Sequence, residues 1–260
     1  MWNPRPLLPD VLLVPGWQER SYWMFDLDGT LLDFAPSPDA VKVPSSLVSD
    51  LDTLSRLVSR RVALLSGRAL SDLERLVPLP ALQLAGNHGA EWRIGGRYGR
   101  ALLDPTAEAR WAEVRAWARE LGQRYPALLV EDKGITITLH LRSLGADLKE
   151  RVHDLVRRQL SVWPDVALRP AHLALELFLP ALPNKGTLVR RLLEGLPSTV
   201  VPYVFGDDWT DEDSFRAVPE GVTVVVGSRR PTAARYALEG PAALRALLHR
   251  VVSAHPLSSR

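Results

Sequence analysis

Residues 22–30 read YWMFDLDGT, an apolar run that ends in two acids and a glycine. The apolar part predicts a buried strand, and Asp26 and Asp28 follow where that strand ends. Side chains two residues apart in an extended chain point to the same side, so the two carboxylates should lie close together. Close carboxylates repel each other and lose hydration. We therefore expect a cation, or a proton shared in a reaction, between them.

Strand and helix patterns alternate on both sides of this stretch. Such alternation is typical of a parallel sheet with helices on both faces, so the fold class is predicted to be α/β, doubly wound. The expected strands cover residues 22–27, 61–66, 202–207 and 222–227, and the expected helices cover 45–60, 69–77, 185–196 and 240–252. Within residues 82–94, a further strand is expected to lead into a turn, with Asn87, His88 and Gly89 at its end.

The pattern changes between residues 104 and 181. Here the sequence predicts two amphipathic helices, a hairpin with Asp-Lys-Gly at its turn, and one further strand over 166–180. That strand is expected to bury Leu173 together with the leucines that alternate after it. The segment looks like an α+β insertion. The expected domains are a core of 1–103 and 182–260 and an inserted domain of 104–181.

Composition narrows the function classes. The chain has 260 residues, no cysteine and a formal net charge of +2. Without cysteine there are no disulfides and no thiolate metal sites, which fits a reducing cytoplasm. No apolar run has the length of a membrane span, and the first residues do not resemble a signal peptide. Basic residues are scattered rather than concentrated, which argues against nucleic-acid binding.

Further polar residues follow the predicted core strands or begin a helix. Asp207, Asp208 and Asp211 follow one strand, Ser66 follows another, and Lys185 begins a helix. Ligands of open parallel sheets bind at the carboxyl ends of the strands, so these residues should meet Asp26 and Asp28 there. Oxygen ligands suit Mg²⁺, and a lysine with a hydroxyl group can bind a phosphoryl group. The set predicts phosphoryl-transfer chemistry.

The motifs that carry these residues resemble a known family. DLDGTLL, LLSGR, NKG and FGDDWTDEDSF are similar to the four motifs of the haloacid dehalogenase-like phosphatases, in the same order. AGNHGAEWR, VEDKGITITLHLR and LELFLPALPNKG resemble the trehalose-6-phosphate phosphatases within that superfamily. The resemblance covers the chain from about residue 22 onward. It implies a Rossmann-like core with an inserted cap domain, and hydrolysis of trehalose 6-phosphate in trehalose biosynthesis.

The resemblance also implies roles for the core residues. Asp26 would attack phosphorus and form an aspartyl-phosphate, and Asp28 would act as the general acid and then the base. Mg²⁺ would be held by Asp26, the backbone carbonyl of Asp28 and Asp207. Asp211 would complete the metal shell through a bound water or would orient Lys185, and Asp208 is a weaker candidate for the same shell. Ser66 and Lys185 would bind phosphate oxygens.

Substrate contacts are expected from both predicted domains. By resemblance, Glu131, Lys133, Arg142 and Glu176 would bind the trehalose part, and His140 lies beside them on the polar face of the predicted strands. In the core, Thr30, Gly67, Arg68, Asn87 and His88 are expected near the substrate. Two linkers join the domains, which suggests closure of the cap over the sugar.

Several alternatives stay open from the sequence. A related phosphatase could act on sucrose phosphate, mannosyl-3-phosphoglycerate or a phosphohexose. A non-catalytic sugar-phosphate sensor is a second class, but it would be expected to lack Asp26, Asp28 or Lys185. The expected partner is a small sugar phosphate, and a trehalose-phosphate synthase is a further candidate. A monomer is the default oligomeric state.

Overall fold

The computed structural model describes residues 4–7, 9–35, 40–171, 173–227 and 230–255. The chain divides into two compact units. The larger unit comprises Met1–Arg100 and Asn184–Arg260, and the smaller unit comprises Ala101–Pro183.

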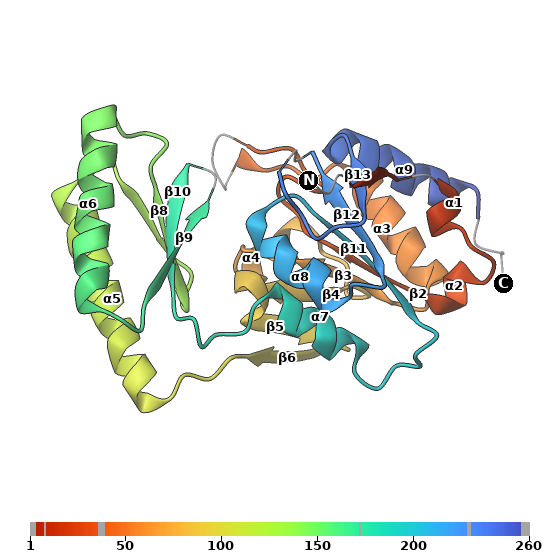
Figure 1. Cartoon of the computed structure of the whole chain (residues 1–260), viewed down its shortest axis with the longest axis horizontal. Coiled ribbons are helices and arrows are strands. Elements are labelled where there is room, and N and C mark those ends of the chain that lie inside the picture. The colour runs from red at the N-terminus through yellow and green to blue at the C-terminus, as the bar shows by residue number, and fades with distance from the viewer. Residues whose placement is uncertain (1–3, 8, 36–39, 172, 228–229, 256–260) are drawn as a thin grey trace. The chain divides into compact units, whose positions relative to one another are not determined.

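The larger unit is built on a sheet with the strand order β1-β13-β12-β11-β2-β3-β4-β5-β6 (Figure 1). Pairings from β1 through to β4 are parallel, and β4–β5 and β5–β6 are antiparallel. The strands are β1 (Arg5–Pro6), β2 (Ser21–Phe25), β3 (Val62–Leu65), β4 (Gln83–Gly86), β5 (Glu91–Ile94), β6 (Arg97–Arg100), β11 (Val201–Gly206), β12 (Val222–Val226) and β13 (Tyr236–Leu238).

Strand β2 lies at the centre of this sheet, and all of its residues are buried. Its side chains alternate between two cores. Trp23 and Phe25 pack in a cluster with the helices α3 (Ser45–Leu57) and α9 (Pro241–Ser253), whereas Met24 packs with α7 (Lys185–Leu193) and α8 (Glu212–Ala217). Helices therefore cover both faces, as the α/β prediction required. The helices of this unit are α1 (Pro9–Leu12), α2 (Trp17–Arg20), α3 (Ser45–Leu57), α4 (Leu70–Leu76), α7 (Lys185–Leu193), α8 (Glu212–Ala217) and α9 (Pro241–Ser253).

The smaller unit is an antiparallel sheet with two helices on one face (Figure 1). Its strand order is β7-β8-β10-β9. Apolar side chains on one face of the sheet and on both helices form one buried cluster, which leaves the polar residues to the opposite face. The elements are α5 (Pro105–Arg124), β7 (Leu129–Asp132), β8 (Thr136–His140), α6 (Ala146–Val162), β9 (Ala167–Ala171) and β10 (Ala174–Phe178).

One strand prediction was wrong. The single strand expected over 166–180 is a hairpin of β9 and β10, and Leu173 lies in its turn with φ 54° and 47% exposed. The left-handed backbone at Leu173 reverses the chain, so this leucine leaves the core. The strand that begins near residue 82 ends at Gly86, just before Asn87 as expected, and the chain returns antiparallel as β5.

Among the described residues, no helix combines the length and apolar character that crossing a membrane requires.

Candidate active site

Asp26 follows β2 directly and lies where β2 and β11 end side by side. Its backbone N–H donates to Phe205 O at 2.9 Å, which continues the pairing of the two strands. Lys185 is the first residue of α7, whose start is capped by the Asn184 side chain. The Lys185 amine is buried and donates to Asp26 Oδ1 at 2.6 Å and to Asp211 Oδ1 at 2.8 Å. Three predicted residues thus meet in one buried contact.

Asp211 also orders the loop that carries the other acids. Its second oxygen, Oδ2, accepts the backbone N–H groups of Asp207 and Asp208, each at 3.0 Å. The Asp208 carboxylate caps the short helix η3 (Trp209–Asp211) and accepts the Trp209 N–H at 2.6 Å. The structure therefore gives Asp208 a capping role and places Asp211 against Lys185.

The acids form a crowded, buried group. Carboxylate oxygens of Asp26, Asp207 and Asp211 lie within 4.8 Å of one another. Burial raises the pKa of Asp26 to about 7, although Lys185 opposes this rise. Burial, followed by the charges of Asp26 and Asp211, raises the pKa of Asp207 to about 9. Burial would lower the pKa of Lys185, but the two carboxylates that it contacts raise it above its usual range.

This group fits a divalent cation. All of its ligand atoms are carboxylate oxygens, the donors that hard cations prefer. The raised pKa values of Asp26 and Asp207 reflect negative charge held out of water, which a bound cation would offset. Asp26, Asp207 and Asp211 are therefore the residues that would hold a metal ion.

The turn after Asp28 is shaped to admit Asp207. Gly29 has φ 88°, and a β-carbon there would come within 2.2 Å of Asp207 Oδ2. Thr30 is buried, and its hydroxyl donates to Asp207 Oδ1 at 3.1 Å. The structure thus places Thr30, predicted near the substrate, as a support of the acidic group.

The Asp28 side chain is held by Arg68. The Arg68 guanidinium donates Nε to Asp28 Oδ2 at 2.6 Å and Nη2 to Asp28 Oδ1 at 2.9 Å. Its Nη1 donates to Asp72 Oδ2 at 2.6 Å, from the first turn of α4. Burial would raise the pKa of Asp72, but hydrogen bonds from Arg68 and Arg75 hold it below its usual range. A two-point contact of this kind fixes a carboxylate in direction as well as position.

Ser66 and the segment after β4 form one compact loop structure. The Ser66 hydroxyl accepts the Arg68 N–H at 3.2 Å, and the Ser66 carbonyl accepts the His88 N–H at 2.9 Å. Asn87 and His88 both have left-handed backbones, with φ 47° and 57°. A β-carbon at Gly67 would come within 2.6 Å of the His88 ring. Strained backbone at consecutive residues persists only where surrounding contacts enforce it, and it is common near functional sites.

The polar face of the smaller sheet gathers most of the predicted sugar-binding residues. Lys133 Nζ lies 3.4 Å from Glu176 Oε1, and His140 Nε2 lies 2.8 Å from Glu131 Oε2. Glu176 is buried, whereas Arg142 is exposed beyond the end of β8.

Sequence reasoning missed two arginines. Arg169 of β9 lies 3.4 Å from Glu176 Oε2. Arg230 donates to the buried Glu212 at 2.6 Å and to the backbone carbonyl of Asp208 at 2.5 Å, so it ties a distant loop to the acidic one. Neither arginine lies in a motif, and no sequence signal separates them from the many surface arginines.

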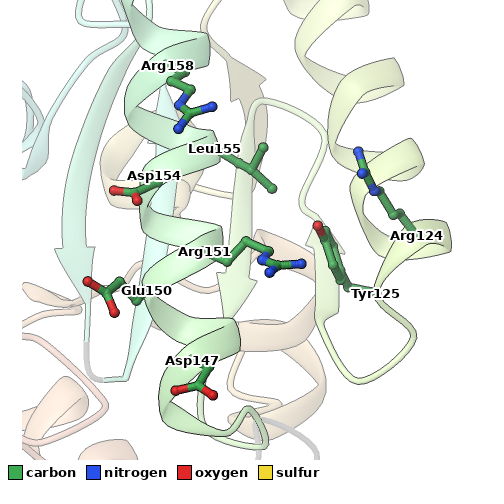
Figure 2. A pocket seen from close by; sticks show the side chains of 8 residues that line it. All are labelled: Arg124, Tyr125, Asp147, Glu150, Arg151, Asp154, Leu155 and Arg158. Carbon is green, nitrogen blue, oxygen red and sulfur yellow. The ribbon is translucent and has the colours of Figure 1, made fainter.

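A cavity of about 450 Å³ lies between the end of α5 and α6 in the smaller unit (Figure 2). Basic and acidic side chains line it in equal numbers, and most of them are exposed, as on a solvated helix surface. None of its residues was predicted as a site residue. They are Arg124, Tyr125, Asp147, Glu150, Arg151, Asp154, Leu155 and Arg158.

Comparison with known proteins matches this arrangement to one family. The trehalose-phosphatase family model matches residues 24–242, which include the acidic group, Lys185 and the whole smaller unit. The chain belongs to the trehalose-phosphatase family. Trehalose-phosphatases are phosphatase enzymes, and the resemblance noted in the sequence is confirmed.

Individual relatives agree with the family match. The chain is 32% identical over 218 residues to the trehalose-6-phosphate phosphatase of Escherichia coli, covering 82% of this chain and 80% of the relative. It is 36% identical over 211 residues to a probable trehalose-phosphate phosphatase of Sinorhizobium fredii, and the alignment covers 79% of this chain and 77% of the relative. Among solved structures, the C-terminal domain of Candida albicans trehalose-6-phosphate phosphatase aligns with a TM-score of 0.82 and 22% identity, and the alignment covers 98% of this chain and 100% of that domain. That last likeness supports the fold.

Proposed function

We propose that this protein hydrolyses trehalose 6-phosphate to trehalose and phosphate, with Asp26 as the nucleophile and Mg²⁺ as the cofactor. The observation that carries the chemistry is the buried contact of Lys185 with both Asp26 and Asp211. The substrate is supported by the family match and by relatives named as phosphatases of this sugar phosphate.

In the first step, an oxygen of Asp26 attacks the phosphorus atom. The new Asp26–phosphorus bond forms as the bond from phosphorus to the sugar oxygen breaks. Asp28 donates a proton to that leaving oxygen, so trehalose departs as a neutral alcohol. Lys185, already beside Asp26, offsets negative charge on the phosphoryl group.

In the second step, Asp28 is a carboxylate and removes a proton from water. The water oxygen bonds to phosphorus while the Asp26–phosphorus bond breaks, which releases phosphate and restores Asp26. Arg68 supports this step because its two-point contact presents Asp28 as an ordered carboxylate.

The remaining site residues bind and orient. Asp26, Asp207 and Asp211, with the backbone carbonyl of Asp28, would hold Mg²⁺, which neutralises phosphoryl charge when bound. The Ser66 hydroxyl would donate to a phosphate oxygen. The sugar would be bound by the polar face of the smaller sheet, through Glu131, Lys133, His140, Arg142 and Glu176.

The test is phosphate release from trehalose 6-phosphate, sucrose 6-phosphate and glucose 6-phosphate, with Mg²⁺ or with EDTA. Asp26→Asn removes the nucleophile, and Asp147→Asn on the exposed start of α6 is the matched control. We expect Mg²⁺-dependent release that is selective for trehalose 6-phosphate, abolished in Asp26→Asn and retained in the control. Release only from another sugar phosphate would refute the substrate, and full activity of Asp26→Asn would refute the mechanism.

A further inference from the structure

The polar face of the smaller sheet carries one row of side chains that crosses all four strands. Glu131 of β7 pairs with Thr138 of β8, Thr138 pairs with Glu176 of β10, and Glu176 pairs with Arg169 of β9. Residues directly opposite each other on neighbouring strands share a face, so the four side chains stand in line. Thr138 and Arg169 are the members of the row that have no sugar-binding role so far, and Arg169 is the charged one.

Glu176 has a cation beside each of its oxygens. Arg169 Nε lies 3.4 Å from Glu176 Oε2, and Lys133 Nζ lies 3.4 Å from Glu176 Oε1. The Glu176 side chain is only 3% exposed. A carboxylate out of water depends on such partners for both its charge and its orientation.

Arg169 is itself held in place by an aromatic ring. Its guanidinium carbon lies 3.9 Å from the centre of the Phe178 ring. Phe178 is two residues from Glu176 in β10 and therefore lies on the same face of the sheet. Stacking of a planar guanidinium on a ring fixes its plane, which a lysine cannot reproduce. Phe178 thus orders Arg169, and Arg169 orders Glu176.

We propose that Arg169 is a positioning residue for sugar recognition: stacked on Phe178, it holds Glu176 so that the carboxylate accepts hydrogen bonds from hydroxyl groups of a disaccharide phosphate. This inference rests on the proposed function and adds a determinant of substrate selectivity. Hydroxyl groups are recognised by few polar groups of fixed direction, so a freely rotating Glu176 would bind the sugar less well. The phosphoryl chemistry depends on Asp26 and Lys185 and would be unaffected.

The test compares trehalose 6-phosphate with p-nitrophenyl phosphate, an ester that has no sugar. Arg169→Met should raise KM for trehalose 6-phosphate about tenfold, because Glu176 would no longer be held in position to bind the sugar. The kcat/KM of Arg169→Met for p-nitrophenyl phosphate should stay within about twofold of the wild-type value, because this ester has no sugar for Glu176 to bind. Arg169→Lys keeps the positive charge but loses the stacking on Phe178. Its KM for trehalose 6-phosphate should lie between those of the wild type and Arg169→Met. Phe178→Leu should resemble Arg169→Lys.

The matched control is Arg115→Met, which removes an arginine of the same unit that pairs with Asp132 at the surface, 3.0 Å away. It should leave both substrates unchanged. Equal losses on both substrates in Arg169→Met, or an unchanged KM for trehalose 6-phosphate, would overturn the inference. If Arg169→Met does not fold, Arg169→Lys and Phe178→Leu decide by the same comparison. A wild-type protein that cleaves p-nitrophenyl phosphate but not trehalose 6-phosphate would instead refute the proposed function.

Discussion

Replacing Lys185 with methionine tests the central contact of the site. Methionine keeps most of the side-chain length and removes the charge, so Asp26 and Asp211 lose the amine that they share. The change leaves three carboxylates crowded together within the protein. We expect both a less stable fold and a large loss of activity.

The loss of stability can be bounded from the burial and the contacts. Lys185 is 2% exposed, and removal of one partner from a buried ion pair destabilises a protein by about 3–5 kcal/mol. The pKa of Asp26 is about 7 even with the lysine present, so Asp26 gains a proton near neutral pH when the lysine is gone. That protonation keeps the loss near the lower end, about 3 kcal/mol, which corresponds to a fall in Tm of about 6–12 °C.

The assay is thermal unfolding followed by circular dichroism, in EDTA and then in Mg²⁺, with Lys42→Met as the exposed control. Mg²⁺ should raise the Tm of Lys185→Met more than that of wild type, because the variant has more uncompensated charge for the ion to offset. We expect kcat to fall by about 100- to 1,000-fold, as when one transition-state donor is removed. A folded variant with a Tm within about 2 °C of wild type would refute the reasoning, since that shift is worth less than about 1 kcal/mol.

In EDTA, Tm should fall as pH rises from 5 to 9. The pKa values of Asp26 and Asp207 in the folded protein are raised to about 7 and about 9. Over this pH range the folded state therefore binds protons that the unfolded state has already released, so a rise in pH favours unfolding. A Tm that rises over this range would contradict those shifts, and added Mg²⁺ should flatten the fall. Arg68→Met should reduce kcat for trehalose 6-phosphate and for p-nitrophenyl phosphate alike, because in the proposed mechanism Arg68 orders the Asp28 carboxylate for the second step, which both esters share. A reduction confined to trehalose 6-phosphate, or an unchanged kcat for both esters, would exclude that role. Gly29→Ala should weaken Mg²⁺ binding by about tenfold or more in calorimetry, because its β-carbon would displace Asp207; unchanged affinity would show that the loop adapts.

The main features of the core followed from local patterns. A buried apolar strand that ends in Asp26, and the strand before Asp207, could be recognised because both strands are buried on both faces and read as continuous apolar runs. Parallel strands place their carboxyl ends at one edge, so the meeting of these acids was expected from topology. Lys185 was expected there too, and the Asn184 cap explains why the helix begins at that lysine.

Side-chain pairings across long separations did not follow from the sequence. Arg68 and Asp28 are 40 residues apart, and only the folded geometry aligns the guanidinium with that carboxylate. The hairpin turn at Leu173 also has no sequence signal, because leucine rarely adopts a left-handed backbone and glycine or asparagine marks such turns more often. Arg169 was missed for the same reason, since the error over 166–180 hid the strand that carries it.

The order of the chain has a consequence for how the protein is made. Asp26 and Lys185 are separated by 159 residues, and Thr30 and Asp207 by 177, so the smaller unit is synthesised before either pair can meet. Until β11 emerges from the ribosome, β2 exposes an unpaired, strongly apolar edge. Closing so long a loop is slow, and aggregation competes with it. The apolar strand β2, which ends just before Asp26, should therefore benefit from protection by a chaperone while the chain is being made.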